Sequence, residues 1–200
     1  LRRNLTIEWS CLSRVDNLDV EMLSWMKKAG CVRVIVGVES YAPGVLEMFG
    51  KRIAPETINA RLRLIREAGM ESLGFIIVGG PFESEADFEL TRRGVLASPL
   101  DLVIVDTLSI YGGSDLTQRF KQDVEFQLLP YISRWKNPEV ERVALQREKT
   151  LYRQFYFRPR ILLRQMYTIF RYPARSFRLF LLLISFLFSS SQNRERKDLF

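Results

Sequence analysis

Short apolar segments rich in β-branched residues alternate with helix-like segments along the first half of the chain. The pattern predicts strands at residues 5–10, 32–38, 72–78 and 100–108, and the second of these is almost uninterrupted in its apolar character. A continuous apolar strand is typical of a sheet covered on both faces. Helices are predicted between the strands, at residues 18–30, 55–68 and 83–96. Four strands separated by three helices predict a parallel α/β sheet.

Local signals mark the ends and faces of these helices. Asp16 or Asn17 is the expected N-cap of the first helix. Trp25 and Met26 are expected on the face of that helix that packs on the sheet. Pro55 suits the first turn of the second helix, where its missing N–H group is not needed.

Length and composition set the class of protein. The chain has 200 residues, of which 47% are hydrophobic and 26% charged, as in globular domains, so we expect one main domain with an appendage. It has no histidine, which excludes His-activated nucleophiles, His general bases and zinc sites built on imidazole. Cys11 and Cys31 are too few for a Cys-only zinc site. We expect both to be reduced core residues of a cytoplasmic protein, with their pairing as the alternative.

Polar and glycine residues follow each predicted strand. They are Ser13, Arg14 and Asp16 after the first, Glu39 and Ser40 after the second, Gly79, Gly80, Pro81 and Glu83 after the third, and Tyr111, Gly112, Gly113 and Ser114 after the fourth. In parallel α/β folds the carboxyl ends of the strands meet at one rim, where ligands bind. The pattern equally suits ordinary turns, surface pairs and helix caps, so it leaves both interpretations open.

Four stretches of sequence add a family resemblance. EWSCLSRVD, MKKAGCVRVIVGVES, GFIIVGGPFES and LDLVIVDTLSIYGGS, in this order and spacing, resemble the later strands of radical S-adenosylmethionine (SAM) enzymes, especially the class with an N-terminal cobalamin-binding domain. The resemblance implies a partial TIM-type barrel, the last four βα units of a six-unit radical SAM barrel, at residues 1–116. A helical connector at 117–151 and basic amphipathic helices at 152–200 would follow. It also implies that the chain is the C-terminal part of a longer enzyme.

The implied activity is the reductive cleavage of SAM to a 5′-deoxyadenosyl radical, leading in the cobalamin class to methyl transfer or carbon-skeleton rearrangement of an unidentified small molecule. The family holds its 4Fe-4S cluster on a C-x-x-x-C-x-x-C motif, which this sequence lacks. We therefore expect the chain alone to be inactive, with the iron-sulfur cluster and cobalamin bound only by the full-length enzyme. One alternative is a non-catalytic remnant that associates with a membrane or a partner. A weaker alternative is an unrelated barrel enzyme that binds phosphate.

The resemblance also assigns SAM-binding residues. Glu39 and Ser40 match positions that hydrogen-bond the ribose, where an acceptor faces two vicinal hydroxyls. Gly79, Gly80 and Pro81 match a turn beside the adenosyl group, where absent side chains allow close approach of the backbone.

Other rim residues carry less specific expectations. Arg14 matches an arginine that pairs with a carboxylate of SAM or of a neighbouring loop, and an internal pair with Asp16 is the alternative. Phe82 stands where the family usually has glycine, which predicts a stiffer turn. Lys51 and Arg52 are expected to be a solvated loop pair rather than an anion site.

The charge of the chain is concentrated near its end. The formal net charge is +7, yet no acidic residue lies between Lys149 and Glu195, so the basic character does not indicate nucleic-acid binding by the front of the chain. At 100° per residue, six arginines fall within an arc of about 60°: Arg153, Arg160, Arg164, Arg171, Arg175 and Arg178. The opposite side carries Tyr152, Phe155, Leu162, Leu163, Met166, Ile169, Phe170 and Phe177.

This pattern is typical of a helix lying in the interface of an anionic membrane. The apolar run at 179–188 is too short to span a bilayer, which takes about 20 residues. Peripheral attachment to the inner face of the membrane is therefore one expectation. Packing of these helices on the protein's own barrel or cobalamin domain is the other.

Overall fold

The computed structural model describes residues 7–126 and 133–171. The chain divides into two compact units, Leu1–Phe155 and Tyr156–Phe200, and each is described by itself. No helix within the described residues is long and apolar enough to cross a membrane.

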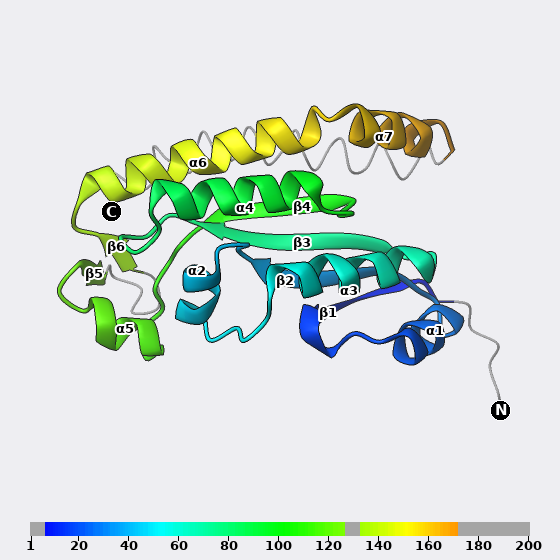
Figure 1. Ribbon diagram of the computed structural model, residues 1–200, viewed down its shortest axis with the longest axis horizontal. Helices are drawn as coiled ribbons and strands as arrows, with labels where there is room; N and C mark the ends of the chain where they lie inside the picture. The colour runs from blue at the N-terminus through cyan, green and yellow to red at the C-terminus, as the bar shows by residue number, and fades with distance from the viewer. Residues whose placement is uncertain (1–6, 127–132, 172–200) are drawn as a thin grey trace. The chain divides into compact units, whose positions relative to one another are not determined.

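The first unit is built on a four-stranded parallel sheet. Its strands run in the spatial order β1-β2-β3-β4 and are β1 (Trp9–Arg14), β2 (Cys31–Glu39), β3 (Glu71–Val78) and β4 (Leu102–Thr107) (Figure 1). The order in space is the order in the chain, as expected when each strand is joined to the next by a crossover helix. The predicted α/β fold with a parallel sheet is confirmed.

Helices cross between these strands: α1 (Val20–Lys28), α2 (Pro43–Met48), α3 (Pro55–Glu67) and α4 (Glu85–Ala97). The expected cap of α1 was wrong, because residues 15–17 form a 3-10 turn and the carboxylate of Asp19 instead accepts a hydrogen bond from the Met22 N–H at 2.7 Å. Helix α4 begins with a reciprocal capping box between Ser84 and Asp87. Helix α2 was not predicted, since its six residues are too few to show a periodic pattern.

The core lies between the sheet and its helices. Helix α3 buries Ile58, Leu62 and Ile65, whose spacing of four and three residues places them on one face. Helix α1 buries Leu23, whereas Trp25 is 62% exposed with the Lys28 ammonium 4.7 Å from its ring. The expectation that Trp25 packs on the sheet was therefore wrong.

Strand β1 lies further along the chain than predicted. It pairs with β2 from Trp9 opposite Cys31 to Arg14 opposite Gly37. Its exposed and half-buried positions alternate, and Leu12 is 72% exposed. A strand with one open face tolerates serine and arginine, which is why apolar content alone misplaced it.

The chain after β4 is only partly helical. Helix α5 (Asp115–Phe120) leads to two short antiparallel strands, β5 (Val124–Phe126) and β6 (Ser133–Trp135), where a helical connector was expected. Helix α6 (Pro138–Tyr156) follows, and α7 (Pro159–Arg171) belongs to the second unit. Pro159 begins α7, so the chain between the two helices is not one continuous helix.

Helix α6 packs along α4 and the edge of β4. Leu151 and Phe155 are fully buried, and the Tyr152 hydroxyl accepts a hydrogen bond from the Val105 N–H at 3.0 Å. Arg92 on α4 donates to the Gln154 side chain at 2.7 Å. Phe155 thus belongs to the core of the first unit and half-buried Tyr152 is bonded to β4, so their expected place on a membrane-facing side was wrong.

Candidate functional site

The candidate site lies at the carboxyl ends of the four strands. Figure 1 shows that α2, α5, β5 and β6 are at this end of the sheet. The predicted residues Arg14, Glu39, Gly79 and Gly80 end β1, end β2 and follow β3, so the fold places them on one rim. Parallel sheets bind ligands at such a rim.

Glu39 ends β2 in a strained conformation. Its φ is 66°, a left-handed value in a residue that is not glycine, and the pairing of β2 with β3 shifts register between Gly37 and Glu39. The Glu39 carboxylate forms an ion pair with Lys51 at 3.0 Å, and Lys51 also donates to the Gly37 carbonyl at 2.6 Å. The two charged side chains are only 17% and 11% exposed. Lys51 is therefore not a solvated loop residue, which corrects the expectation from sequence, while Arg52 is exposed.

Ser40 is placed differently from Glu39. It is fully buried, and its hydroxyl lies 2.7 Å from the Thr91 hydroxyl on α4 and accepts the Ala42 N–H at 3.0 Å. These bonds connect the end of β2 to α4 and to the start of α2. Ser40 has a structural task here, and its contact with a ribose stays a prediction.

Two glycines form the turn after β3. Gly79 and Gly80 have φ values of 85° and 108°, which L side chains rarely adopt. A side chain on Gly79 would also collide with Ala144 of α6. Pro81, the next residue of the predicted motif, is exposed. Both glycines are buried, Gly79 against Ala144 and Gly80 beside Leu108 and Phe82.

A buried ion pair lies beneath this turn. The Glu83 carboxylate accepts the Gly79 N–H at 2.7 Å and a hydrogen bond from Arg147 of α6 at 2.7 Å, both on Oε2. Arg147 also donates to the Glu83 carbonyl at 3.0 Å and pairs with Glu85 at 3.0 Å. Burial raises the pKa of Glu83, while the Gly79 N–H and Arg147 partly offset that rise. The sequence pointed to Glu83 as a loop residue but gave no sign of Arg147.

Arg14 makes the internal pair that the sequence left as an alternative. Its guanidinium donates two hydrogen bonds to the Asp16 carboxylate, at 3.0 and 2.8 Å, and 51% of the Arg14 side chain is exposed. This pairing lowers the pKa of Asp16, and the charge of Lys51 contributes to that lowering. Arg14, Asp16, Lys51 and Glu39 form a charged rim of alternating sign. Binding of a SAM carboxylate by Arg14 stays a prediction.

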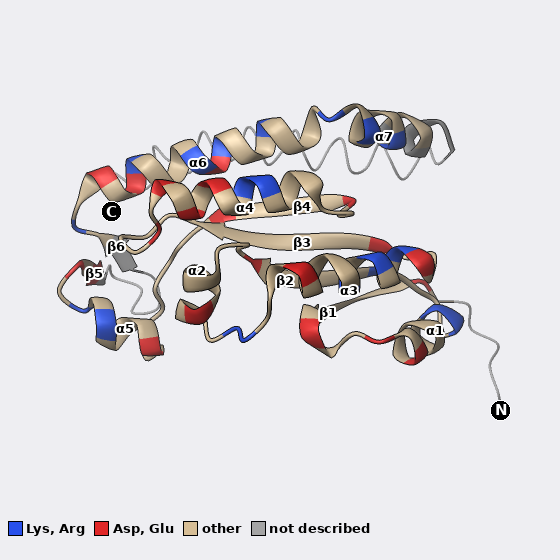
Figure 2. Ribbon diagram, in the orientation of Figure 1, with Lys and Arg blue, Asp and Glu red and all other residues tan. Residues whose placement is uncertain are grey.

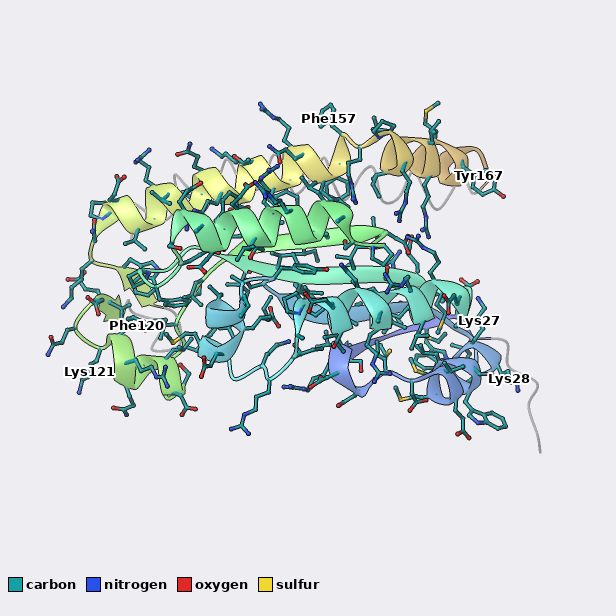
Figure 3. The ribbon with its side chains drawn as sticks, in the orientation of Figure 1. Lys27, Lys28, Phe120, Lys121, Phe157 and Tyr167 are labelled. Carbon is teal, nitrogen blue, oxygen red and sulfur yellow. The ribbon has the colours of Figure 1, made fainter. Side chains whose placement is uncertain are left out.

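A row of aromatic rings extends from the turn. Phe82 lies 5.9 Å from Phe49 and 5.5 Å from Phe120, and Phe120 lies 5.8 Å from Trp135, measured between ring centroids. The Trp135 indole N–H donates to the Leu108 carbonyl at 3.2 Å. Figure 3 shows Phe120 at the same end of the sheet as the rim. The row attaches α5 and β6 to the turn, a role that Phe82 alone did not indicate.

The two cysteines do not form a metal site. Both are free, and within residues 7–126 and 133–171 no group of three Cys, Asp or Glu side chains could hold a metal ion. Burial and the neighbouring Cys31 raise the pKa of the Cys11 thiol to about 11. Two cysteines do not fit a cluster that needs three thiolates.

Comparison with known proteins finds a family similarity for the N-terminal part of the chain. Residues 1–93 match the family model of the Radical SAM superfamily. Over these residues the chain is similar to radical SAM proteins. The same end of the chain carries the first three of the sequence stretches that resemble radical SAM enzymes.

Two curated proteins are similar to the chain well beyond residues 1–93. An uncharacterized methyltransferase of Pyrococcus horikoshii is 23% identical over 83% of this chain and 38% of its own length. The anaerobic magnesium-protoporphyrin IX monomethyl ester cyclase of Cereibacter sphaeroides is 28% identical over 84% of this chain and 28% of its own length. The chain thus spans about a third of the length of these relatives.

A solved structure shares the fold. The apo form of OxsB, a cobalamin-dependent S-adenosylmethionine radical enzyme, aligns with 72% of this chain and 29% of its own, with a TM-score of 0.57 and 14% identity. At this identity the likeness concerns the fold alone. It agrees with a partial radical SAM barrel.

Proposed function

We propose that this chain forms the later half of a radical SAM barrel of the cobalamin-dependent class, and that it binds the adenosyl part of SAM. The radical SAM match, the methyltransferase and cyclase names of the two relatives and the fold shared with OxsB support this proposal. The cluster-binding cysteines would come from a segment outside these 200 residues, since two cysteines cannot provide them.

The conformation of Glu39 is the observation that carries the proposal. A non-glycine residue at φ 66° costs free energy, and such outliers gather at binding and catalytic sites. The strain puts a carboxylate at the carboxyl end of a central strand, held on one oxygen by Lys51. The other carboxylate oxygen makes no hydrogen bond within the described part of the chain, so it can accept one from a ligand hydroxyl.

The rim residues would divide the binding of SAM between them. Glu39 would accept hydrogen bonds from the ribose, the Gly79–Gly80 backbone would lie against the adenosyl group, and Arg14 and Lys51 offer cations for the carboxylate of SAM. Bound at a reduced cluster, SAM would supply the 5′-deoxyadenosyl radical needed to remove a hydrogen atom from a substrate carbon. The residues of this chain would bind SAM and orient its adenosyl group. Methyl transfer or carbon-skeleton rearrangement of a small molecule would follow.

The test is the affinity of the complete enzyme for SAM. Protein made from the complete reading frame is reconstituted anaerobically, and SAM binding is measured by equilibrium dialysis for Glu39→Ala and wild type. Loss of hydrogen bonds to a charged acceptor costs about 1–3 kcal/mol, which raises the Kd by roughly 5- to 150-fold.

The matched control is Glu71→Ala. Glu71 also pairs with a basic residue, Arg33, but at the amino end of β3, at the end of the sheet opposite the rim. This variant should leave SAM affinity unchanged. Equal affinity in the wild type and Glu39→Ala, or absence of SAM binding by the complete enzyme, would refute the proposal.

The 200-residue chain by itself gives a second check. After anaerobic reconstitution with iron and sulfide it should hold no stoichiometric iron-sulfur cluster and release no 5′-deoxyadenosine from SAM. A stoichiometric cluster that disappears in a Cys11→Ala, Cys31→Ala double variant would contradict the account of the cysteines.

A second candidate function, attachment to an anionic membrane surface, rests on α7. Its described part carries basic but no acidic residues (Figure 2). Leu162, Leu163, Met166 and Tyr167 of α7, and Phe157 just before it, are 42–72% exposed (Figure 3). Arg175, Arg178 and the apolar run at 179–188 lie outside the described residues. A basic helix with an exposed apolar face suits the lipid interface.

Vesicle co-sedimentation tests this second candidate. Each arginine near an anionic surface contributes about 1 kcal/mol, and the attraction decays over a Debye length of about 10 Å at 0.1 M salt. Binding should therefore require anionic lipid and weaken as salt rises. A Leu163→Asp, Tyr167→Asp variant should no longer bind the anionic vesicles. A Leu90→Asp variant, changed at an exposed leucine of α4, should bind them as the wild type does. Equal pelleting of all three proteins would exclude α7 as the attachment site.

A further inference from the structure

Helix α6 is seated directly on the turn that follows β3. Ala144 is 2% exposed, and a Cβ on Gly79 would lie well inside 3.0 Å of its methyl carbon. Arg147 is three residues further along α6 and therefore projects from the same side of the helix. One face of α6 thus provides a small residue against the turn and a guanidinium beneath it.

The guanidinium of Arg147 is held from several directions. It donates to the carbonyl and the carboxylate of Glu83 and to the carboxylate of Glu85, and it lies 5.1 Å from the ring centroid of Phe88. The Arg147 side chain is 9% exposed and that of Glu83 is 1% exposed. A planar fork of donors can make these contacts together, which an ammonium group cannot.

A single oxygen atom connects this pair to the turn. Glu83 Oε2 accepts both the Arg147 Nη1–H and the Gly79 N–H, each at 2.7 Å. The other oxygen, Oε1, is buried and has no hydrogen-bond partner among the described residues. Glu83 Oε2 therefore links Arg147 of α6 to the Gly79 amide.

We propose that Arg147 is a positioning residue for SAM, which holds the Gly79–Gly80 backbone in its binding conformation through Glu83. This inference rests on the proposed function, because it assumes that the turn lies against the adenosyl group. It adds α6, which lies outside the matched segment 1–93, to the machinery that shapes the site. Removing Arg147 would leave a buried carboxylate without its counter-charge, and the Gly79 N–H would lose a fixed acceptor.

The first arm of the test measures the turn itself. Amide hydrogen exchange is followed on the 200-residue chain for wild type, Arg147→Met and Arg147→Lys. Exchange at Gly79 should become at least tenfold faster in Arg147→Met, with a smaller increase in Arg147→Lys, while core amides of β2 keep their protection. The control is Arg142→Met, since Arg142 pairs with Glu139 on the exposed face of α6 and is 64% exposed.

The second arm measures SAM in the complete enzyme. The Kd for SAM should rise about tenfold in Arg147→Met and stay unchanged in Arg142→Met, at equal folded fractions. If the wild type binds SAM and Arg147→Met binds it equally tightly with a protected Gly79 amide, the positioning role is wrong. If the wild-type enzyme fails to bind SAM, the proposed function is wrong, whereas the exchange result still reports whether Arg147 holds the turn.

A further variant covers the case in which Arg147→Met does not fold. The Glu83→Gln, Arg147→Met double variant carries no uncompensated buried charge and keeps an amide oxygen near Gly79. It should fold and still show fast exchange at Gly79 and weakened SAM binding. Wild-type protection and affinity in this double variant would overturn the inference.

Discussion

Replacing Gly79 with alanine tests the close contact between the turn and α6. At φ 85° an alanine is strained by about 1–2 kcal/mol, the cost of a left-handed conformation in an L residue. Its methyl group would also press into Ala144, and overpacking of a well-packed site costs about 1–3 kcal/mol. Gly79→Ala should therefore lower the free energy of unfolding by about 2–5 kcal/mol.

Two companion variants separate these contributions. Gly113 has a φ of 88°, and a Cβ added there would meet nothing within 4 Å, so Gly113→Ala should show the conformational cost of about 1–2 kcal/mol alone. Ala144→Gly should cost about 1–2 kcal/mol through helix propensity and a lost buried methyl group. The Gly79→Ala, Ala144→Gly double variant relieves the collision, so its cost should fall below the sum of the single costs by about 1–3 kcal/mol.

The assay is urea unfolding of the 200-residue chain, followed by far-UV circular dichroism, with the dependence on urea checked for each variant. A change in that dependence would show that the variant alters more than stability. Two results together would refute the seating of α6 on the turn. The double variant would lose as much stability as the sum of Gly79→Ala and Ala144→Gly, and Gly79→Ala would lose no more than Gly113→Ala.

Three other experiments probe single features. The pKa of Cys11 is raised to about 11, so its alkylation by iodoacetamide at pH 8 should be slow and rise about tenfold per pH unit toward pH 11. A fast reaction at pH 8 would contradict the half-buried position of this thiol beside Cys31. Arg92 and Arg93 lower the pKa of Glu89 to about 2. The stabilising effect of the ionised Glu89 should therefore be complete above pH 4.5 and disappear as pH falls toward 2. In an Arg92→Ala, Arg93→Ala variant, NMR titration should show the pKa of Glu89 back near 4.5. Ser40→Ala should lower the free energy of unfolding by about 1–3 kcal/mol because it leaves buried Thr91 short of a partner, and a change below about 0.5 kcal/mol would rule out the structural task of Ser40.

The parallel sheet could be predicted because its signal is local. Strand β2 is apolar almost throughout, and glycines close the helices on either side of it, so its existence follows from neighbouring residues. Strand β1 was displaced because a half-open edge strand mixes serine, leucine and arginine. Its position depends on pairing with β2, which residue composition does not record.

The candidate site was only partly predictable for the same reason. Glu39, Gly79 and Gly80 follow strands directly, so the rule that places sites at strand ends finds them. Lys51 was misjudged as solvated because its burial depends on the return of the chain to Gly37. Arg147 gave no signal at all, since its partner Glu83 lies 64 residues earlier in the sequence.

That separation of 64 residues has a consequence for how the protein is made. Each strand of the sheet pairs with the strand before it, so the sheet can assemble in step with translation. Glu83 can form its ion pair only after Arg147 has been synthesised, about 3–13 s later at roughly 5–20 residues per second. During that interval the nascent chain has a carboxylate at Glu83 without its counter-charge. The contact that fixes the turn after β3 is therefore completed after the sheet that carries it.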